Sequence, residues 1–147
     1  MHEKLKDVET VEQLRACYPV MRELRPHLQS EEEFVARVTR MNAQGYRILA
    51  AWEGGEVVAL AGYRLEENLV YGRFLYVDDL VAGEQTRGQG WGARLLERLT
   101  AYADQAECAK LVLDTGLANA RAQRFYFREG LMTGAMRFGK FLKAGAA

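Results

Sequence analysis

Three glycines stand at alternate positions in one short stretch of the chain, Arg87-Gly88-Gln89-Gly90-Trp91-Gly92, and a helical pattern follows directly. Glycine adopts positive φ without strain and lets a ligand approach the backbone, because it has no Cβ. A helix that begins in such a loop directs unpaired N–H groups and the positive end of its dipole into the loop. The pattern predicts an anion site, most often for phosphate or diphosphate. A flexible loop without a ligand is the alternative, since short glycine patterns are weak signals alone.

The elements that position this loop follow from periodicity and from capping residues. Thr10 and Ser30 each precede apolar residues at helical spacing, which predicts two helices near the N-terminus. Gly54-Gly55 is typical of a hairpin turn between two strands. Strands are expected within residues 5–8, 46–53, 56–65, 70–81 and 110–115, and further helices after the glycine loop up to residue 105 and over 120–128. Met132–Leu142 is expected to supply one or two final strands.

This order of elements predicts an α/β (α+β) fold with a mixed, mostly antiparallel central sheet of six to seven strands and helices on both faces. The length of 147 residues predicts a single domain over residues 1–147. Lys+Arg and Asp+Glu both number 20, so the formal net charge is zero and no basic field predicts nucleic acid or a membrane as partner.

The cysteines and the apolar segments indicate the compartment. Cys17 and Cys108 lie far apart and without metal-ligand spacing, which favours reduced thiols in a cytoplasmic protein and predicts no metal site. The N-terminal residues lack the apolar core of a secretory signal. No apolar run approaches the roughly 18 residues of a membrane span.

Two further blocks accompany the glycine loop. The strand before it carries apolar residues, an acidic pair and a leucine in Leu75–Val81, and a later block combines Asn119 and Ala122 with Phe125-Tyr126 and Gly130-Leu131. The loop itself fits Arg/Gln-x-x-Gly-x-Gly/Ala from Arg87 to Gly92. In this order and at these separations, the three blocks resemble the Gcn5-related N-acetyltransferase (GNAT) superfamily. The resemblance covers about Ile48–Leu131 and implies an enzyme that transfers the acetyl group of acetyl-CoA directly to a primary amine of a small molecule, peptide or protein.

The resemblance also implies how acetyl-CoA is held. Backbone N–H groups from Gly88 to Ala93 would bind the diphosphate, with added charge from Arg87 and Arg94. The edge of Leu80-Val81-Ala82, splayed from the strand at 111–115, would bind the pantetheine arm and the thioester carbonyl. Asn119 would bind the arm, cap a helix, or both. The full expected set is Leu80, Val81, Ala82, Arg87, Gly88, Gln89, Gly90, Trp91, Gly92, Ala93, Asn119, Ala122 and Tyr126.

Two side chains are assigned to the chemistry by the same resemblance. Tyr126 is the candidate general acid for the departing thiolate, and a core aromatic is the alternative. Asp78 matches a position where several relatives carry a Glu that acts through water. Alternatively, Asp78 or Asp79 caps a turn or pairs with an arginine such as Arg73. Because neighbours on a strand face opposite ways, only one of the two aspartates is expected to face the acceptor.

Two other functions stay open at this stage. A non-catalytic acyl-CoA-binding module would keep the same loop. A dinucleotide-binding domain fits Gly88-x-Gly90-x-x-Ala93, with Asp114 as the ribose-binding acid. The long segment at 82–87, the late position of the loop and the few strands after it speak against that domain. The residues do not identify the acceptor amine, and a homodimer through the final strands is open.

Overall fold

The computed structural model describes residues 4–143, and the chain divides into two compact units, Met1–Leu113 and Asp114–Ala147. The first unit holds a five-stranded sheet with helices on both of its faces. The second holds one helix and a segment without helix or strand after it. The expectation of a single domain over residues 1–147 stays a prediction.

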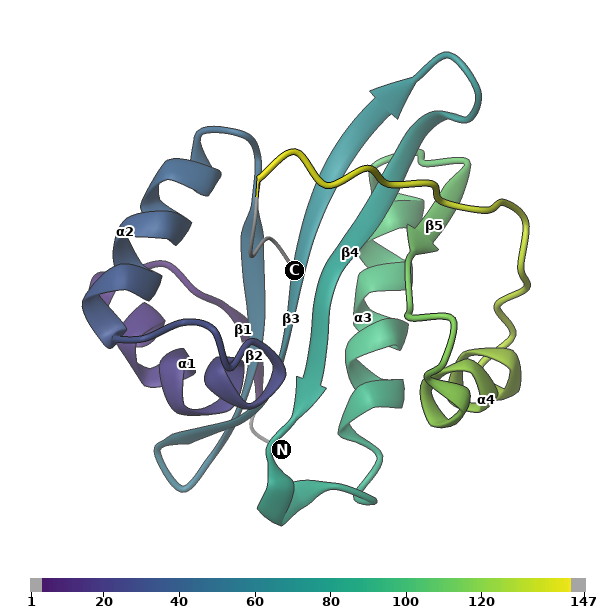
Figure 1. The fold of residues 1–147 in the computed structure, drawn as a ribbon. Helices are drawn as coiled ribbons and strands as arrows, with labels where there is room; N and C mark the ends of the chain where they lie inside the picture. Colours follow the sequence, from purple (N-terminus) through teal and green to yellow (C-terminus); the bar gives the residue numbers. More distant parts are fainter. Residues whose placement is uncertain (1–3, 144–147) are drawn as a thin grey trace. The chain divides into compact units, whose positions relative to one another are not determined.

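The sheet of the first unit has strand order β1-β2-β3-β4-β5 (Figure 1). Its strands are β1 (Leu5–Asp7), β2 (Arg47–Glu53), β3 (Glu56–Asn68), β4 (Gly72–Ala82) and β5 (Lys110–Leu113). The first four pair antiparallel in chain order, and β5 lies parallel to β4. The mixed, mostly antiparallel sheet is therefore confirmed.

The expected number of six to seven strands is wrong, because the described residues form five strands. Met132–Leu142, which was expected to supply the last strands, contains none. Gly134 and Gly139 interrupt this segment, and glycine weakens a strand because it has no side chain to pack. Its large apolar side chains are exposed, namely Met132, Met136, Phe138, Phe141 and Leu142.

Three helices cover the sheet of the first unit. Helices α1 (Val11–Leu24) and α2 (Glu31–Asn42) lie on one face and α3 (Trp91–Gln105) lies on the other (Figure 1). The predicted caps are confirmed: Thr10 Oγ1 accepts from the Gln13 N–H at 3.1 Å, and Ser30 Oγ accepts from the Glu33 N–H at 3.0 Å. Each cap satisfies a helix N–H that otherwise has no partner.

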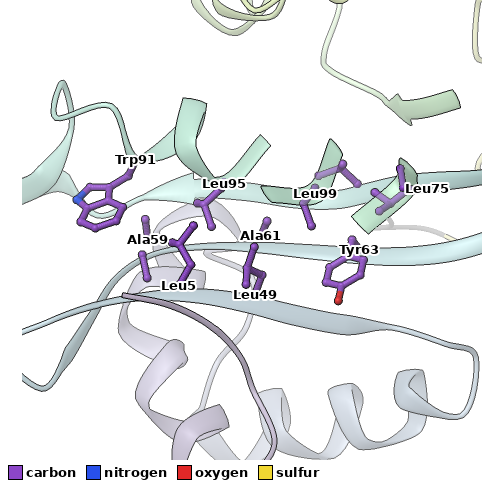
Figure 2. Close-up of a cluster of buried hydrophobic side chains, with 12 residues drawn as sticks. Leu5, Leu49, Ala59, Ala61, Tyr63, Leu75, Trp91, Leu95 and Leu99 are labelled. Atoms are coloured by element: carbon purple, nitrogen blue, oxygen red, sulfur yellow. The ribbon is translucent and has the colours of Figure 1, made fainter. Parts of the chain in front are cut away.

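Each face of the sheet carries its own apolar core. On one face, Leu95 and Leu99 of α3 pack with Leu49, Ala61 and further strand residues (Figure 2). On the other face, side chains of α1 and α2 pack with β2 and β3, among them Leu14, Cys17, Phe34, Val38, Ile48 and Leu60. Because successive strand residues point to opposite faces, the two cores together hold both sides of the sheet.

The second unit begins with the helix α4 (Ala120–Arg128), whose bounds match the sequence prediction. Asn119 caps it, since the Oδ1 atom accepts from the Ala122 N–H at 3.1 Å. The helix ends before Gly130, which has φ 92°. Further along, Arg137 forms an ion pair with Asp114.

Candidate functional site

The glycine loop joins β4 to α3 through the 3-10 turn η1 (Glu84–Thr86). Gly88 and Gly90 both have φ 83°, and no atom lies within 4 Å of where a Cβ would stand on either. Glycine is therefore required here by the backbone conformation, since side-chain-bearing residues avoid this region. Gly90 is the N-cap residue of α3, which begins at Trp91.

The start of α3 presents unpaired hydrogen-bond donors. The backbone N–H groups of Gly90, Trp91, Gly92 and Ala93 donate to no residue within 4–143, and the first bond of the helix runs from the Arg94 N–H to the Gly90 carbonyl at 3.1 Å. The loop from Gly88 to Gly90 is exposed. Several free donors together with the positive end of the helix dipole favour an anion such as a diphosphate.

The side chains around this loop have different surroundings. Arg87 is exposed, with its Nη2 atom 3.6 Å from Glu23 Oε1 of α1. The same Glu23 oxygen accepts from the Glu84 N–H at 2.9 Å, so α1 also contacts the start of the loop. The ring of Trp91 is buried beneath α3, where Figure 2 shows it at the end of the apolar core. Trp91 therefore offers the loop its backbone N–H and not its ring.

One edge of β4 extends past its neighbouring strand. The β4–β5 ladder runs from Phe74 opposite Lys110 to Val77 opposite Leu113, where β5 ends. Strand β4 continues to Ala82, so its last residues have no strand on the β5 side within the described part of the first unit. An exposed strand edge pairs with extended ligands through main-chain hydrogen bonds. Leu80, Val81 and Ala82 all lie on this free edge.

A β-bulge lies at the start of this free edge. Gly62 of β3 stands opposite Asp79 and Tyr63 opposite Val77, which leaves Asp78 as an extra residue of β4. Before the bulge, Leu75 and Val77 pack in the α3 core, and after it Leu80 and Ala82 do. Asp78 and Asp79 therefore both face the α1–α2 side. The expectation that these neighbours face opposite ways is wrong, because a bulge inserts one residue into the alternation.

Asp79 is buried, with 9% of its surface exposed, and it is held from two sides. Its Oδ2 accepts from the Tyr46 hydroxyl at 2.6 Å, and its Oδ1 accepts from Arg25 Nε at 2.9 Å. Burial raises the pKa of Tyr46 well above its usual value, and the Asp79 carboxylate raises it further. Tyr46 is therefore a lasting hydrogen-bond donor to Asp79.

Asp78 pairs with Arg64 of β3 and not with Arg73, the partner that the sequence offered as an example. Arg64 Nε lies 3.2 Å from both carboxylate oxygens, and Arg64 Nη2 lies 3.1 Å from Oδ2. Burial raises the pKa of Asp78, although its hydrogen bond to Arg64 acts in the opposite direction. Asp78 thus accepts a proton more readily than an ordinary surface aspartate.

The other expected site residues lie in the second unit. Tyr126 is half-buried on α4, its ring centroid is 5.4 Å from that of Phe125, and burial raises its pKa. Its hydroxyl bonds to no residue within 4–143. Asn119 and Ala122 form the cap of the same helix. The structure thus brings the loop, the free edge and Asp78 together in the first unit, and Asn119, Ala122 and Tyr126 together in the second.

The network around Asp79 was not foreseen from the sequence. Arg25 follows α1, Tyr46 precedes β2 and Gly62 lies within β3, and none of the three belongs to a motif. Gly62 gave the one available signal, because a glycine inside an apolar strand often marks a close approach or a bulge. A Cβ there would lie 2.0 Å from Tyr46 Oη and 2.5 Å from Asp79 Oδ2.

The described residues were also compared with what a metal site, a membrane span and a dinucleotide-binding domain require. Within residues 4–143, no group of three or more His, Cys, Asp and Glu side chains is placed to hold a metal ion. In the same range, no helix is both long and apolar enough to span a membrane. The five-stranded order, antiparallel through its first four strands, also differs from the doubly wound parallel sheet of a dinucleotide-binding domain.

Comparison with known proteins agrees with this geometry. A curated relative, an uncharacterized N-acetyltransferase of Bacillus subtilis, is 29% identical over 122 residues, or 83% of this chain and 86% of that protein. An aminoglycoside N(6′)-acetyltransferase of Serratia marcescens is 33% identical over 76 residues, which are 49% of this chain and 52% of that protein. A solved aminoglycoside N-acetyltransferase in complex with CoA has the same fold, with a TM-score of 0.83 at 14% identity, covering 97% of this chain and 96% of the other.

The family comparison covers most of the chain. The family described as acetyltransferase (GNAT) matches residues 8–130, which include β4, the glycine loop, α3 and α4. The chain belongs to the acetyltransferase (GNAT) family and is an acetyl-CoA-dependent N-acetyltransferase that acts on amines.

Proposed function

We propose that the loop from Gly88 to Ala93 holds the diphosphate of acetyl-CoA, while the free edge of Leu80–Ala82 holds its pantetheine arm and thioester carbonyl. The observation that carries this proposal is the combination of unpaired N–H groups at the start of α3 with the edge of β4 that extends beyond the end of β5. The two features fit the two ends of one ligand. A compact anion needs convergent donors, and an extended amide-bearing arm needs a strand edge.

The reaction needs three kinds of help: stabilisation of the negative oxygen, removal of a proton from the amine, and delivery of a proton to the sulfur. Transfer joins the amine nitrogen to the acetyl carbon, breaks the carbon–sulfur bond and leaves CoA as the thiol. An amide of the free edge near Leu80 or Ala82 stabilises the oxygen as it becomes negative. Asp78 takes the proton of the amine through water, a role that its raised pKa favours. Tyr126 supplies the proton to the sulfur, and its raised pKa keeps the phenol protonated until then.

For the acceptor, we propose a small hydrophilic molecule with a primary amine. Three curated relatives are named for acceptors of this kind, an aminoglycoside, glucosamine 6-phosphate and an aminoalkylphosphonate. The free thiols of Cys17 and Cys108 support a cytoplasmic location, which cell fractionation would test. Homodimer formation stays a prediction, and size-exclusion chromatography with light scattering measures it.

Ligand-induced stabilisation tests the cofactor proposal. At a hundred times its Kd, a ligand of the folded state stabilises by about 2.7 kcal/mol. Coenzyme A should therefore raise the melting temperature by several degrees, and NAD should not. Gly90→Val should abolish this shift, because Gly90 needs positive φ at the start of α3. The matched control is Gly139→Val, since Gly139 has ordinary φ and no atom near its Cβ position. An unchanged shift in Gly90→Val would exclude this loop as the binding site.

Turnover tests the assignment of the acid. We expect Tyr126→Phe to lower kcat by about a hundredfold while the Kd of CoA changes less than about twofold, as loss of a general acid does. Release of free CoA thiol, measured over a panel of amines, peptides, polyamines and aminoglycosides, gives the rate and identifies the acceptor. Unchanged turnover in Tyr126→Phe would make Tyr126 a packing residue. CoA binding with no turnover on any amine would instead favour a non-catalytic binding module.

A further inference from the structure

The C-terminal end of α1 contacts the bulge of β4 through one side chain. Arg25 is the C-cap residue of α1, and its N–H donates to the Met21 carbonyl at 2.8 Å. Its guanidinium crosses to β4, where Nε donates to Asp79 Oδ1 at 2.9 Å and Nη2 donates to the Asp78 carbonyl at 2.8 Å. Arg25 therefore holds a side chain and a main-chain carbonyl of the bulge at the same time.

These contacts fall where β4 is least constrained by its neighbours. Asp78 is outside the register with β3, and pairing with β5 stops one residue earlier, at Val77. A main-chain carbonyl at a bulge has lost its regular ladder partner, and a buried carbonyl needs another. The Asp78 carbonyl accepts this hydrogen bond from Arg25 Nη2. On the other side of the Asp79 carboxylate, the Tyr46 hydroxyl donates to Oδ2 at 2.6 Å.

We propose that Arg25 is a positioning residue for the thioester. By fixing the main chain at Asp78 and Asp79, it sets the direction in which the free edge from Leu80 leaves the bulge. The consequence for the ligand rests on the proposed function, whereas the contact with the bulge does not. Arg25 acts through the strand and does not itself touch the reacting atoms.

The two ends of the cofactor should respond differently to the loss of Arg25. The thioester carbonyl would meet the amides closest to the bulge, at Leu80 and Ala82. The diphosphate would bind from Gly88 onward, on a loop that has its own contacts with α1 through Glu23. Loss of Arg25 should therefore weaken the binding of acetyl-CoA far more than that of CoA, which keeps the diphosphate and the pantetheine arm but lacks the acetyl carbonyl.

The experiment compares Arg25→Met and Arg25→Lys with wild type and with the control Arg22→Met. Arg22 lies on the same helix, is exposed, and contacts the Tyr18 ring at 5.8 Å instead of β4. Calorimetry gives the Kd of CoA and of acetyl-CoA, and hydrogen exchange without ligand reports on the amides of Asp79–Val81 that pair with β3. For Arg25→Met, we expect about tenfold weaker acetyl-CoA binding, about tenfold faster exchange of these amides, and a CoA affinity within about twofold of wild type.

Arg25→Lys keeps the charge beside Asp79 but loses the second contact, so its effects should be intermediate, and it serves as the folded variant if Arg25→Met does not fold. Arg22→Met should match wild type in all three measurements. Wild-type exchange and affinities in both Arg25 variants would overturn the proposal. Equal weakening of CoA and acetyl-CoA would overturn it too, since that is the result of a merely structural role. Failure of the wild type to bind either ligand would refute the proposed function, and the exchange rates would still decide the contact with the bulge.

Discussion

Among the glycines of the described residues, Gly62 is the one where replacement by alanine should disturb the structure most. The new Cβ would stand 2.0 Å from Tyr46 Oη, 2.6 Å from Tyr46 Cζ and 2.5 Å from Asp79 Oδ2. Contacts this short do not persist, so Tyr46 must move away and give up its 2.6 Å hydrogen bond to Asp79. Both side chains are buried, which leaves little room for the adjustment.

The expected cost has two parts. A hydrogen bond to a charged group contributes about 1.5–3 kcal/mol to stability, and that contribution is lost. Overpacking a well-filled core costs about 1–3 kcal/mol more. We expect Gly62→Ala to lower the free energy of unfolding by about 3–5 kcal/mol, which for a chain of this size corresponds to a fall in melting temperature of about 10 °C.

Urea unfolding at neutral pH, followed by circular dichroism, measures this cost. Gly139→Ala is the matched control, because no atom lies within 4 Å of the Gly139 Cβ position and its φ is ordinary. Its effect should stay within about 1 kcal/mol. Tyr46→Phe removes the hydroxyl alone and should cost about 2 kcal/mol.

The double variant Gly62→Ala/Tyr46→Phe isolates the shared contact. Because Gly62→Ala already breaks the hydrogen bond, the second substitution should cost about 2 kcal/mol less than it does in wild type. Strict additivity of the two costs would show that the alanine does not act through Tyr46. A cost of Gly62→Ala below about 1 kcal/mol would refute the packing argument itself.

Three further predictions concern other parts of the first unit. Burial, and then the hydrogen bond to Asp7, raise the pKa of Tyr63, so the folded protein keeps a proton that the unfolded chain releases above about pH 10. The free energy of unfolding should therefore fall as the pH rises above about 10, and urea unfolding of wild type and Tyr63→Phe should show a shallower fall in the variant. Burial raises the pKa of the Cys17 thiol to about 12, so a thiol reagent should modify half-buried Cys108 in the native protein and Cys17 only after unfolding, as peptide mass spectrometry would show. Glu107 follows the end of α3 with φ 59°, so Glu107→Gly should raise the free energy of unfolding by about 0.5–1 kcal/mol in the same urea assay, and a decrease would contradict the strain argument.

Much of the fold follows from local signals in the sequence. The Gly54-Gly55 pair predicts the β2–β3 hairpin, and both glycines do adopt positive φ, at 58° and 81°. The caps Thr10 and Ser30 fix the starts of two helices through short-range hydrogen bonds. Such features depend on residues three or four apart, so a single sequence contains the information for them.

The segment Met132–Leu142 and the bulge at Asp78 depend on information that a local sequence pattern does not hold. The apolar residues of Met132–Leu142 predict one or two strands, yet whether a segment forms a strand depends on the edge that it pairs with. The bulge at Asp78 is a property of the register between β3 and β4, and register is set by both strands together. For that reason, the orientation of the aspartate pair was predicted wrongly although the strand itself was identified.

The candidate site likewise has one part that local sequence predicts and another that it does not. The glycine loop was predicted because its chemistry lies in consecutive residues. The ion pair of Asp78 with Arg64 and the contact of Arg25 with Asp79 join residues 14 and 54 positions apart. No spacing rule relates such positions, since their approach depends on how α1 packs against the sheet.

The extra residue in β4 gives this strand one position where the chain can shorten during evolution without turning the strand over. Deleting Asp78 would restore simple alternation and keep Leu80 and Ala82 in the core beneath α3, because Asp79 would then follow Val77 on the other face. One lost codon would thus remove the bulge, together with the contacts of Asp78 with Arg64 and Arg25, and leave both cores unaltered. The hairpin tip around the fully exposed Leu69 tolerates a change of length too, since insertions there would not reach either core.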